Sequence, residues 1–172
     1  MDYVTGSVLT GAGATALMDL WVVARKRFLG IPALDYGLVG RWLAYLPRGR
    51  FRHDPIARTP QVRGERLIGW TAHYLIGIAF AGVLLCVWGL EWIREPELAP
   101  ALIVGIGSVA APFLILQPGL GAGIAARRTV RPGAARAQSL VTHAVFGVGL
   151  YAAAWLGNLV RALQAVADQK AA

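Results

Sequence analysis

The sequence predicts an all-α membrane protein in which four transmembrane helices form one antiparallel bundle and residues 1–172 make a single domain. Hydrophobic residues make up 56% of the 172 residues, and the mean hydropathy is +0.54. This composition is too apolar for an ordinary soluble domain of this length. Four apolar runs approach or exceed the roughly 20 residues that a helix needs to cross a bilayer. The predicted spans cover residues 4–24, 67–90, 99–125 and 139–160.

Basic residues gather in two of the connections between these spans. Of the 17 Lys and Arg residues, ten lie within residues 25–66 and four follow the third span. The positive-inside rule therefore places both basic connections in the cytoplasm and both termini on the outer side of the membrane. We predict a multi-pass membrane protein. The net charge of +8 is explained by this topology and by attraction to anionic lipids, and no nucleic-acid-binding motif accompanies the arginines.

A short amphipathic helix is predicted inside the first cytoplasmic connection, residues 25–66. Asp35 can cap a helix that runs to about residue 46. Its apolar side chains share one face at helical spacing. They are Leu38, Val39, Trp42, Leu43 and Leu46. We predict that this helix lies on the inner leaflet as an interfacial helix, and docking under the bundle is the alternative.

The connection continues as a basic stretch that is predicted to be extended. Its cationic side chains, with one arginine of the preceding helix, are predicted to contact anionic lipid headgroups or another anionic ligand. They are Arg41, Arg48, Arg50, Arg52 and His53.

Pro112 and Pro118 lie well inside the third predicted span. A proline inside a helix has no backbone N–H and clashes with the carbonyl four residues earlier. We therefore expect the helix to kink or break near Pro118. The carbonyls that such a break frees at membrane depth must find partners in protein or in a wet cavity.

A strongly polar residue lies at similar depth in each predicted span: Asp19, His73, Gln117 and His143. Thr15 precedes Asp19 by four residues and so shares its helix face. Asp19, His73 and His143 each lie about two helical turns from a basic end of their span. Ionisable residues inside a membrane are costly and usually face a protein interior, a cavity or a partner. These five residues are the predicted polar intramembrane site near the cytoplasmic face.

Several chemistries fit this site, and the sequence leaves them open. Asp19 could pair with His73 or His143 as a clamp between helices. Asp19, His73 and His143 could bind a divalent metal, since carboxylate and imidazole suit Zn, Fe or Cu. The two histidines could instead ligate a haem, with Gly77 and Gly147 leaving room for the macrocycle. Asp19 could also carry protons in a small proton-coupled transporter.

The sequence contains no specific enzyme motif, so no catalytic residue is assigned. We predict a non-enzymatic binding or accessory subunit that acts through a homo-oligomer or a larger membrane complex. The alternatives are a haem- or metal-binding membrane protein and a proton-coupled transporter. The pattern His-x-x-x-Gly occurs at His73–Gly77 and again at His143–Gly147, and it indicates two similar halves, each a helix, a basic connection and a helix.

Several runs of this sequence resemble one known family. They include GATALMD at 13–19, LPRGRFRHD at 46–54, QPG at 117–119 and TH at 142–143. On these runs the chain resembles a family of small bacterial inner-membrane proteins that is catalogued as a domain of unknown function and is related to the YagU-like proteins. The resemblance implies a four-span, multi-pass protein of the bacterial inner (cytoplasmic) membrane, in which the outer side that holds both termini is the periplasm, and it implies no particular activity.

Overall fold

Four helical segments among residues 2–171, the part of the chain that the structure describes, are long and apolar enough to cross a membrane. In this computed structural model they are α1 (Tyr3–Leu29), α3 (Glu65–Trp88), an interrupted segment over Leu98–Leu120, and α7 (Pro132–Ala171). No β-strand occurs in the described residues. The predicted all-α fold class is confirmed, and the four segments fit a multi-pass membrane protein.

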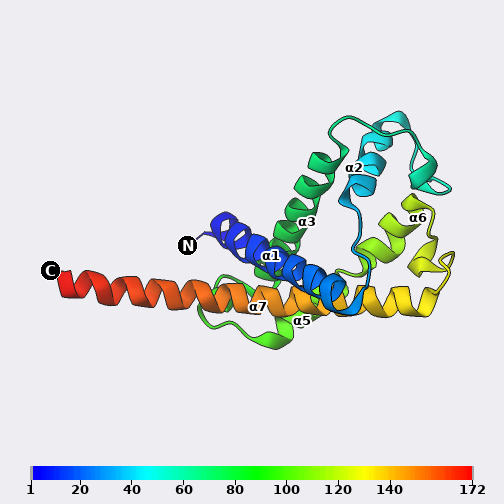
Figure 1. Cartoon of the computed structure of the whole chain (residues 1–172). Coiled ribbons are helices and arrows are strands. Elements are labelled where there is room, and N and C mark those ends of the chain that lie inside the picture. The colour runs from blue at the N-terminus through cyan, green and yellow to red at the C-terminus, as the bar shows by residue number, and fades with distance from the viewer. Residues whose placement is uncertain (1, 172) are drawn as a thin grey trace.

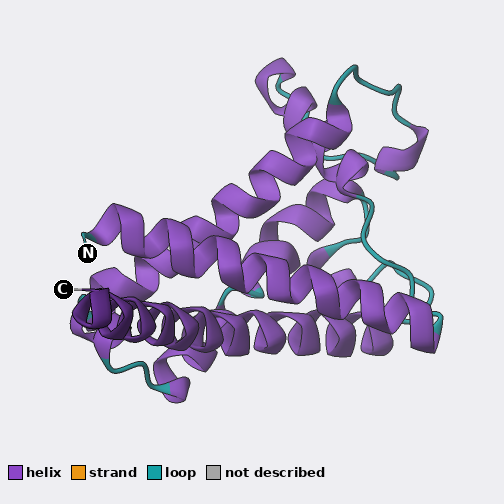
Figure 2. Cartoon of the chain, turned by 60° about the vertical axis from the view of Figure 1, so that its left-hand side comes forward, coloured by secondary structure: helices purple, strands orange, loops and turns teal. Residues whose placement is uncertain are grey.

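Helix α1 lies at the centre of the packing, because it contacts both α3 and α7. Helix α5 (Leu98–Gly107) packs on α7. In Figures 1 and 2, α1 and α7 run side by side in opposite directions, and both chain ends lie at one end of the molecule. Helix α2 (Tyr36–Tyr45) and α6 (Gln117–Leu120) lie at the opposite end (Figure 1). We call these the terminal end and the basic end.

Glycines set the close contacts between the long helices. A Cβ atom added to Gly11 of α1 would lie 2.5 Å from the Cα of Ile78 in α3. A Cβ added to Gly105 of α5 would lie 2.4 Å from the Cα of Gly147 in α7. Small residues of this kind let membrane helices approach without a hydrophobic driving force between them. Each helix that carries a His-x-x-x-Gly pattern therefore meets the preceding span at a glycine.

Apolar side chains fill the centre of the bundle and also cover its outside. Ala14, Ala81, Leu84, Leu85 and Leu150 are fully buried. Trp92 and Ile93 of the short helix α4 (Glu91–Arg94) close this core at the terminal end. Many large apolar side chains elsewhere on the long helices are exposed. Such an extensive apolar exterior is what a surface in contact with lipid requires.

The third span is interrupted, which confirms the predicted break. Helix α5 ends at Gly107, a π-helical turn (η3, Pro112–Leu116) follows, and α6 ends at Leu120. Pro112 and Pro118 have no N–H to donate, and the Gln117 N–H reaches the Pro112 carbonyl, as in a π-helix. The departure from α-helix begins at Ser108, well before Pro118.

Helix α2 forms where the sequence predicts it, and the Asp35 side chain accepts the Gly37 N–H at 2.8 Å as its N-cap. It packs along the first turns of α3. A Cβ at Gly40 would lie 1.8 Å from the Glu65 carbonyl oxygen, so the two backbones touch. Helix α2 therefore docks on the bundle, the alternative that the sequence left open.

The connections at the basic end contain three short 3₁₀ turns. These are η1 (Leu46–Arg48), η2 (Ile56–Arg58) and η4 (Ile124–Ala126). Residues 36–64, which comprise α2, η1, η2 and the loop that follows, are called the docked module below. Helix α7 begins before the predicted fourth span and continues past it at the terminal end.

Candidate functional site

The structure brings Asp19 and His73 together between α1 and α3. The Asp19 Oδ1 atom lies 3.0 Å from His73 Nε2, and the Tyr74 hydroxyl donates to Asp19 Oδ2 at 3.1 Å. The Asp19 and His73 side chains are only 18% and 10% exposed. Both oxygens of the Asp19 carboxylate therefore have partners from α3, which offsets the cost of taking a charge out of water.

Helix α2 adds Tyr36 to this pair. The Tyr36 hydroxyl lies 3.0 Å from the same nitrogen, His73 Nε2, and the two ring centroids are 4.3 Å apart. The Tyr36 ring also packs on Trp70, with 4.5 Å between centroids. Burial, reinforced by the nearby Asp19 carboxylate, raises the pKa of the Tyr36 phenol above its usual range. Tyr36 therefore keeps its proton, and the network joins α1, α2 and α3.

One nitrogen facing two oxygens admits two protonation patterns. When Nε2 of His73 carries a proton, it donates to the Asp19 carboxylate. When Nε2 carries none, it accepts from Tyr36, and Asp19 must then be protonated to avoid facing a lone pair. The Asp19, His73, Tyr36 and Tyr74 side chains are called the polar network below.

The other predicted site residues lie elsewhere. His143 Nδ1 is 2.6 Å from the Ser108 hydroxyl, which also bonds the Gly105 carbonyl of α5. Gln117 Nε2 is 3.5 Å from the Ser139 hydroxyl. The Thr15 hydroxyl is fully buried and donates to the Gly11 carbonyl of its own helix. The five residues thus divide among separate contacts, because the glycine contacts fix a rotation for each helix that turns His143 toward α5.

The geometry contradicts the predicted metal site. Among residues 2–171, no three His, Cys, Asp or Glu side chains lie close enough together to hold a metal ion. The prediction that Asp19, His73 and His143 form one metal site is therefore wrong. The reason is that His143 faces Ser108 while His73 faces Asp19.

The space expected for a haem beside the two glycines is also filled. A Cβ at Gly77 would lie 2.0 Å from the Thr15 hydroxyl oxygen, and one at Gly147 would lie 2.8 Å from the Ala101 carbonyl oxygen. Neighbouring helices occupy both places. The prediction that Gly77 and Gly147 leave room for a macrocycle is therefore wrong.

Arg41 lies in an ion pair inside the protein. Its Nε and Nη2 atoms each donate to a Glu65 carboxylate oxygen at 2.8 Å, and Nη1 donates to the Thr59 carbonyl at 2.9 Å. The carboxylate hydrogen bond raises the pKa of the Arg41 guanidinium. With a side chain only 5% exposed, Arg41 cannot contact lipid headgroups, so that prediction is wrong for this residue. The pair fastens α2 to the start of α3.

His53 is buried as well, and headgroup contact is wrong for it too. Its Nδ1 atom lies 2.8 Å from the Thr59 hydroxyl, and its backbone N–H donates to the Gly119 carbonyl at 3.0 Å. Burial, with a contribution from Arg50, lowers the pKa of His53, so the imidazole is neutral at pH 7. Headgroup contact by Arg48, Arg50 and Arg52, which are exposed, stays a prediction.

The docked module sits on the broken end of the third span. The Trp42 indole N–H donates to the Phe51 carbonyl at 2.8 Å, and a Cβ at Gly119 would lie 2.3 Å from that indole nitrogen. The Gly119 carbonyl, freed by the helix end, accepts the His53 N–H. The backbone group released at the break is therefore satisfied by protein, one of the two outcomes expected from the sequence.

Sequence reasoning missed four residues that shape these contacts: Tyr36, Tyr74, Glu65 and Ser108. One signal could have found the Glu65 pair. Gly37 and Gly40 lie on the same side of α2 as Arg41, four residues and one residue before it. Small residues next to a charged residue indicate a helix face that approaches another helix closely. No comparable signal marks Ser108, whose role depends on how α5 is rotated.

Comparison with known proteins gives a family for this chain. No curated protein and no solved structure is similar to this chain at a significant level. A family described as "Protein of unknown function (DUF2938)" matches residues 8–157, which include most of the four long segments and the whole docked module. Because the match spans well over half of the chain, this protein belongs to the DUF2938 family of proteins of unknown function.

Proposed function

We propose that this protein is a non-enzymatic binding or accessory protein of the bacterial inner membrane. The observation that carries the proposal is the enclosure of the polar network, in which His73 lies 3.0 Å from both Asp19 and Tyr36. The hollow lined by Leu90, Ile93 and Arg161 and the hollow lined by Thr129, Val130 and Gln138 contain no member of the network. Groups that satisfy one another from three helices suit a clamp better than a substrate site.

The clamp gives the docked module a fixed position at the basic end. The module is held by the Tyr36 contact to His73 and by the Arg41–Glu65 pair, while Arg48, Arg50 and Arg52 remain exposed. A rigid, basic platform beside a membrane can bind anionic lipid or an acidic surface of a neighbouring subunit. The partners in this proposal are the bilayer and a homo-oligomer or larger membrane complex.

Orientation is the first testable part of the proposal. A fluorescent protein that folds only in the cytoplasm should fluoresce when inserted after Gly49 and stay dark when fused after residue 172. The reason is that ten of the 17 basic residues lie in residues 25–66, at the end opposite both termini. If the C-terminal fusion fluoresces and the insertion after Gly49 does not, the topology is the reverse of the proposed one.

A second candidate function, proton-coupled transport through Asp19, is favoured by one observation. His73 Nε2 lies at the same distance, 3.0 Å, from the Asp19 carboxylate and the Tyr36 hydroxyl. A proton can therefore move between Asp19 and His73 without a change of fold, while the Tyr36 hydroxyl stays protonated and keeps its contact to His73. Such relays of Asp and His are a recurrent device of membrane pumps and transporters.

Proton flux distinguishes the two functions. The measurement is the acidification of liposomes that contain a pH-sensitive dye, under an imposed membrane potential. Liposomes with the wild-type protein and liposomes with Asp19→Asn should both acidify as slowly as liposomes without protein. The enclosed clamp provides no path, so the carboxylate should make no difference. Asp168→Asn, which changes a carboxylate in the exposed final turns of α7, is the matched control. Faster wild-type flux that Asp19→Asn alone abolishes would replace the accessory function with transport.

A further inference from the structure

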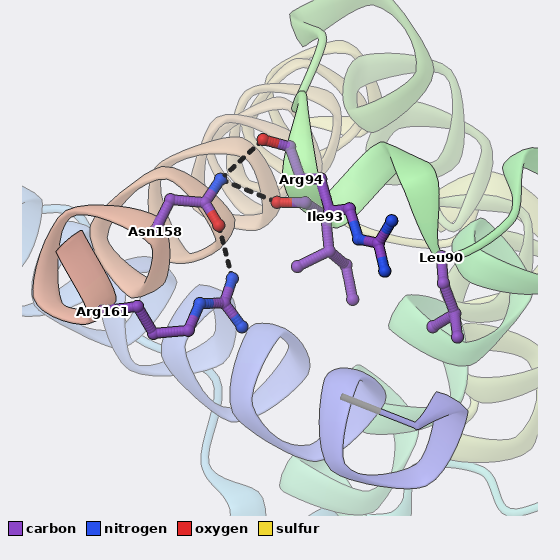
Figure 3. Close-up of a pocket in the computed structure, with 5 residues that line it drawn as sticks. All are labelled: Leu90, Ile93, Arg94, Asn158 and Arg161. Atoms are coloured by element: carbon purple, nitrogen blue, oxygen red, sulfur yellow. Dashed lines mark hydrogen bonds between the residues drawn. The ribbon is translucent and has the colours of Figure 1, made fainter. Parts of the chain in front are cut away.

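A hollow of about 310 Å³ lies at the terminal end, between α4 and α7 (Figure 3). It is lined by Leu90, Ile93, Arg94, Asn158 and Arg161. The Asn158 amide group donates to the carbonyls of Ile93 and Arg94 at 2.8 Å and 3.0 Å. This ties α4 to α7 and gives the hollow a fixed wall.

The charge around this hollow is unusual for its end of the molecule. Only three of the 17 basic residues lie in the predicted periplasmic segments: Arg94, Arg161 and Lys170. Two of the three line the hollow, one from each wall. Arg94 also pairs with Glu91 at 3.0 Å, but both side chains are more than 70% exposed, so solvent weakens that pair.

Asn158 also holds one of the arginines in place. Its two amide hydrogens go to backbone carbonyls, which leaves the side-chain oxygen to accept a hydrogen bond from Arg161 Nη2. Figure 3 shows the Arg161 guanidinium held beside the hollow by this contact, with Arg94 across from it. A guanidinium carries five N–H donors in a planar fork that matches the oxygens of a phosphate.

The hollow lies at the level where lipid headgroups are expected. Leu90 lies two residues after the end of α3 at Trp88, and Asn158 lies two residues before the predicted end of the fourth span at residue 160. Trp88 and Trp155, which are close in sequence to Leu90 and Asn158, are 37% and 50% exposed. Exposed tryptophans are typical of the boundary between hydrocarbon and headgroups. The apolar side of the hollow, Leu90 and Ile93, suits the first carbons of an acyl chain.

We propose that this hollow binds a phosphate group through Arg94 and Arg161, with Asn158 positioning Arg161. A phosphodiester of an anionic phospholipid in the adjacent leaflet and free inorganic phosphate share this chemistry. The site is remote from the polar network, so it stands whether the clamp or the transport function is correct.

Native mass spectrometry of the protein released from nanodiscs tests the proposal. Wild-type protein released from nanodiscs that contain both phosphatidylglycerol and phosphatidylcholine should retain bound phosphatidylglycerol. Arg94→Gln with Arg161→Gln should lower the bound fraction by at least about tenfold, since hydrogen bonds to charged groups are the stronger kind. Lys170→Gln, which removes the third basic residue of this end, should leave it unchanged. Thermal melting of each variant in detergent reports whether it is folded.

Inorganic phosphate titrated into delipidated protein separates the two sources. Retention of phosphatidylglycerol that depends on both arginines and resists millimolar phosphate identifies lipid as the ligand. Phosphate binding that depends on the arginines, without lipid retention, identifies a free anion, and both results support the site. Lipid and phosphate binding that are the same in the double variant and the wild type would overturn it. Arg94→Gln alone, at an exposed position, gives the same test if the double variant does not fold.

Discussion

Alanine at position 40 or position 69 is expected to separate α2 from α3. A Cβ at Gly40 would lie 1.8 Å from the Glu65 carbonyl oxygen, and one at Gly69 would lie 1.8 Å from the Tyr36 carbonyl oxygen. Both obstacles are backbone atoms, which cannot rotate away as a side chain can. Overpacking of this kind costs about 1–3 kcal/mol when the structure can adjust, and we expect at least the upper figure for each variant.

Two measurements check this expectation. The first is the melting temperature in a mild detergent, compared with that of Gly157→Ala, where the added Cβ would meet nothing within 4 Å. The second is trypsin cleavage after Arg41, which is 5% exposed in the folded protein and should become accessible once α2 detaches. Unchanged melting and a protected Arg41 in Gly40→Ala would show that the two helices do not touch as described.

Replacing Arg41 with alanine should be the second most damaging change. It leaves the Glu65 carboxylate, 15% exposed, without the two donors at 2.8 Å that compensate its burial. It also removes the donor to the Thr59 carbonyl, which holds the loop of the docked module. Breaking a buried ion pair from one side typically costs about 3–5 kcal/mol, and the partial exposure of Glu65 favours about 3 kcal/mol here.

A double-mutant cycle measures this pair directly. Arg41→Ala, Glu65→Ala and the double variant should give unfolding free energies that are far from additive, because the second change removes the unpaired charge. Arg41→Lys should recover only part of the loss, since an ammonium cannot make the bidentate contact. Glu91→Ala breaks the exposed pair with Arg94 and should cost less than about 1 kcal/mol. Equal losses for Arg41→Ala and Glu91→Ala would contradict the assignment.

The sequence predicted the spans, the break in the third span and the Asp35 cap because these depend on local properties. Hydropathy, a missing proline N–H and a short side chain before a helix need no partner. Asp19 and His73 were also expected to be candidates for pairing, since both lie about two turns from the basic end. The depth of a residue in its span, however, gives only its position along the helix axis and not the direction in which its side chain points.

Rotation about the helix axis could not be predicted, and it decides the rest of the site. His143 has the depth of His73, yet the contact between Gly105 and Gly147 turns it toward Ser108. Arg41 was expected to face headgroups because it lies outside the apolar stripe of α2, whereas it faces Glu65, which lies 24 residues further along the chain. Both errors arise from reading each helix alone, without the glycines that bring its neighbour close.

Helix α7 has a consequence for distance from the membrane. Its 40 residues correspond to about 60 Å of helix, roughly twice the thickness of a hydrocarbon core. If the spanning part ends near residue 160, the continuous helix raises residue 171 by about 16 Å along its axis. A partner or probe fused to the end of α7 would be held by this helix at a fixed distance from the bilayer. Deleting residues from the protruding part of the helix, one turn at a time, would shorten that distance in steps.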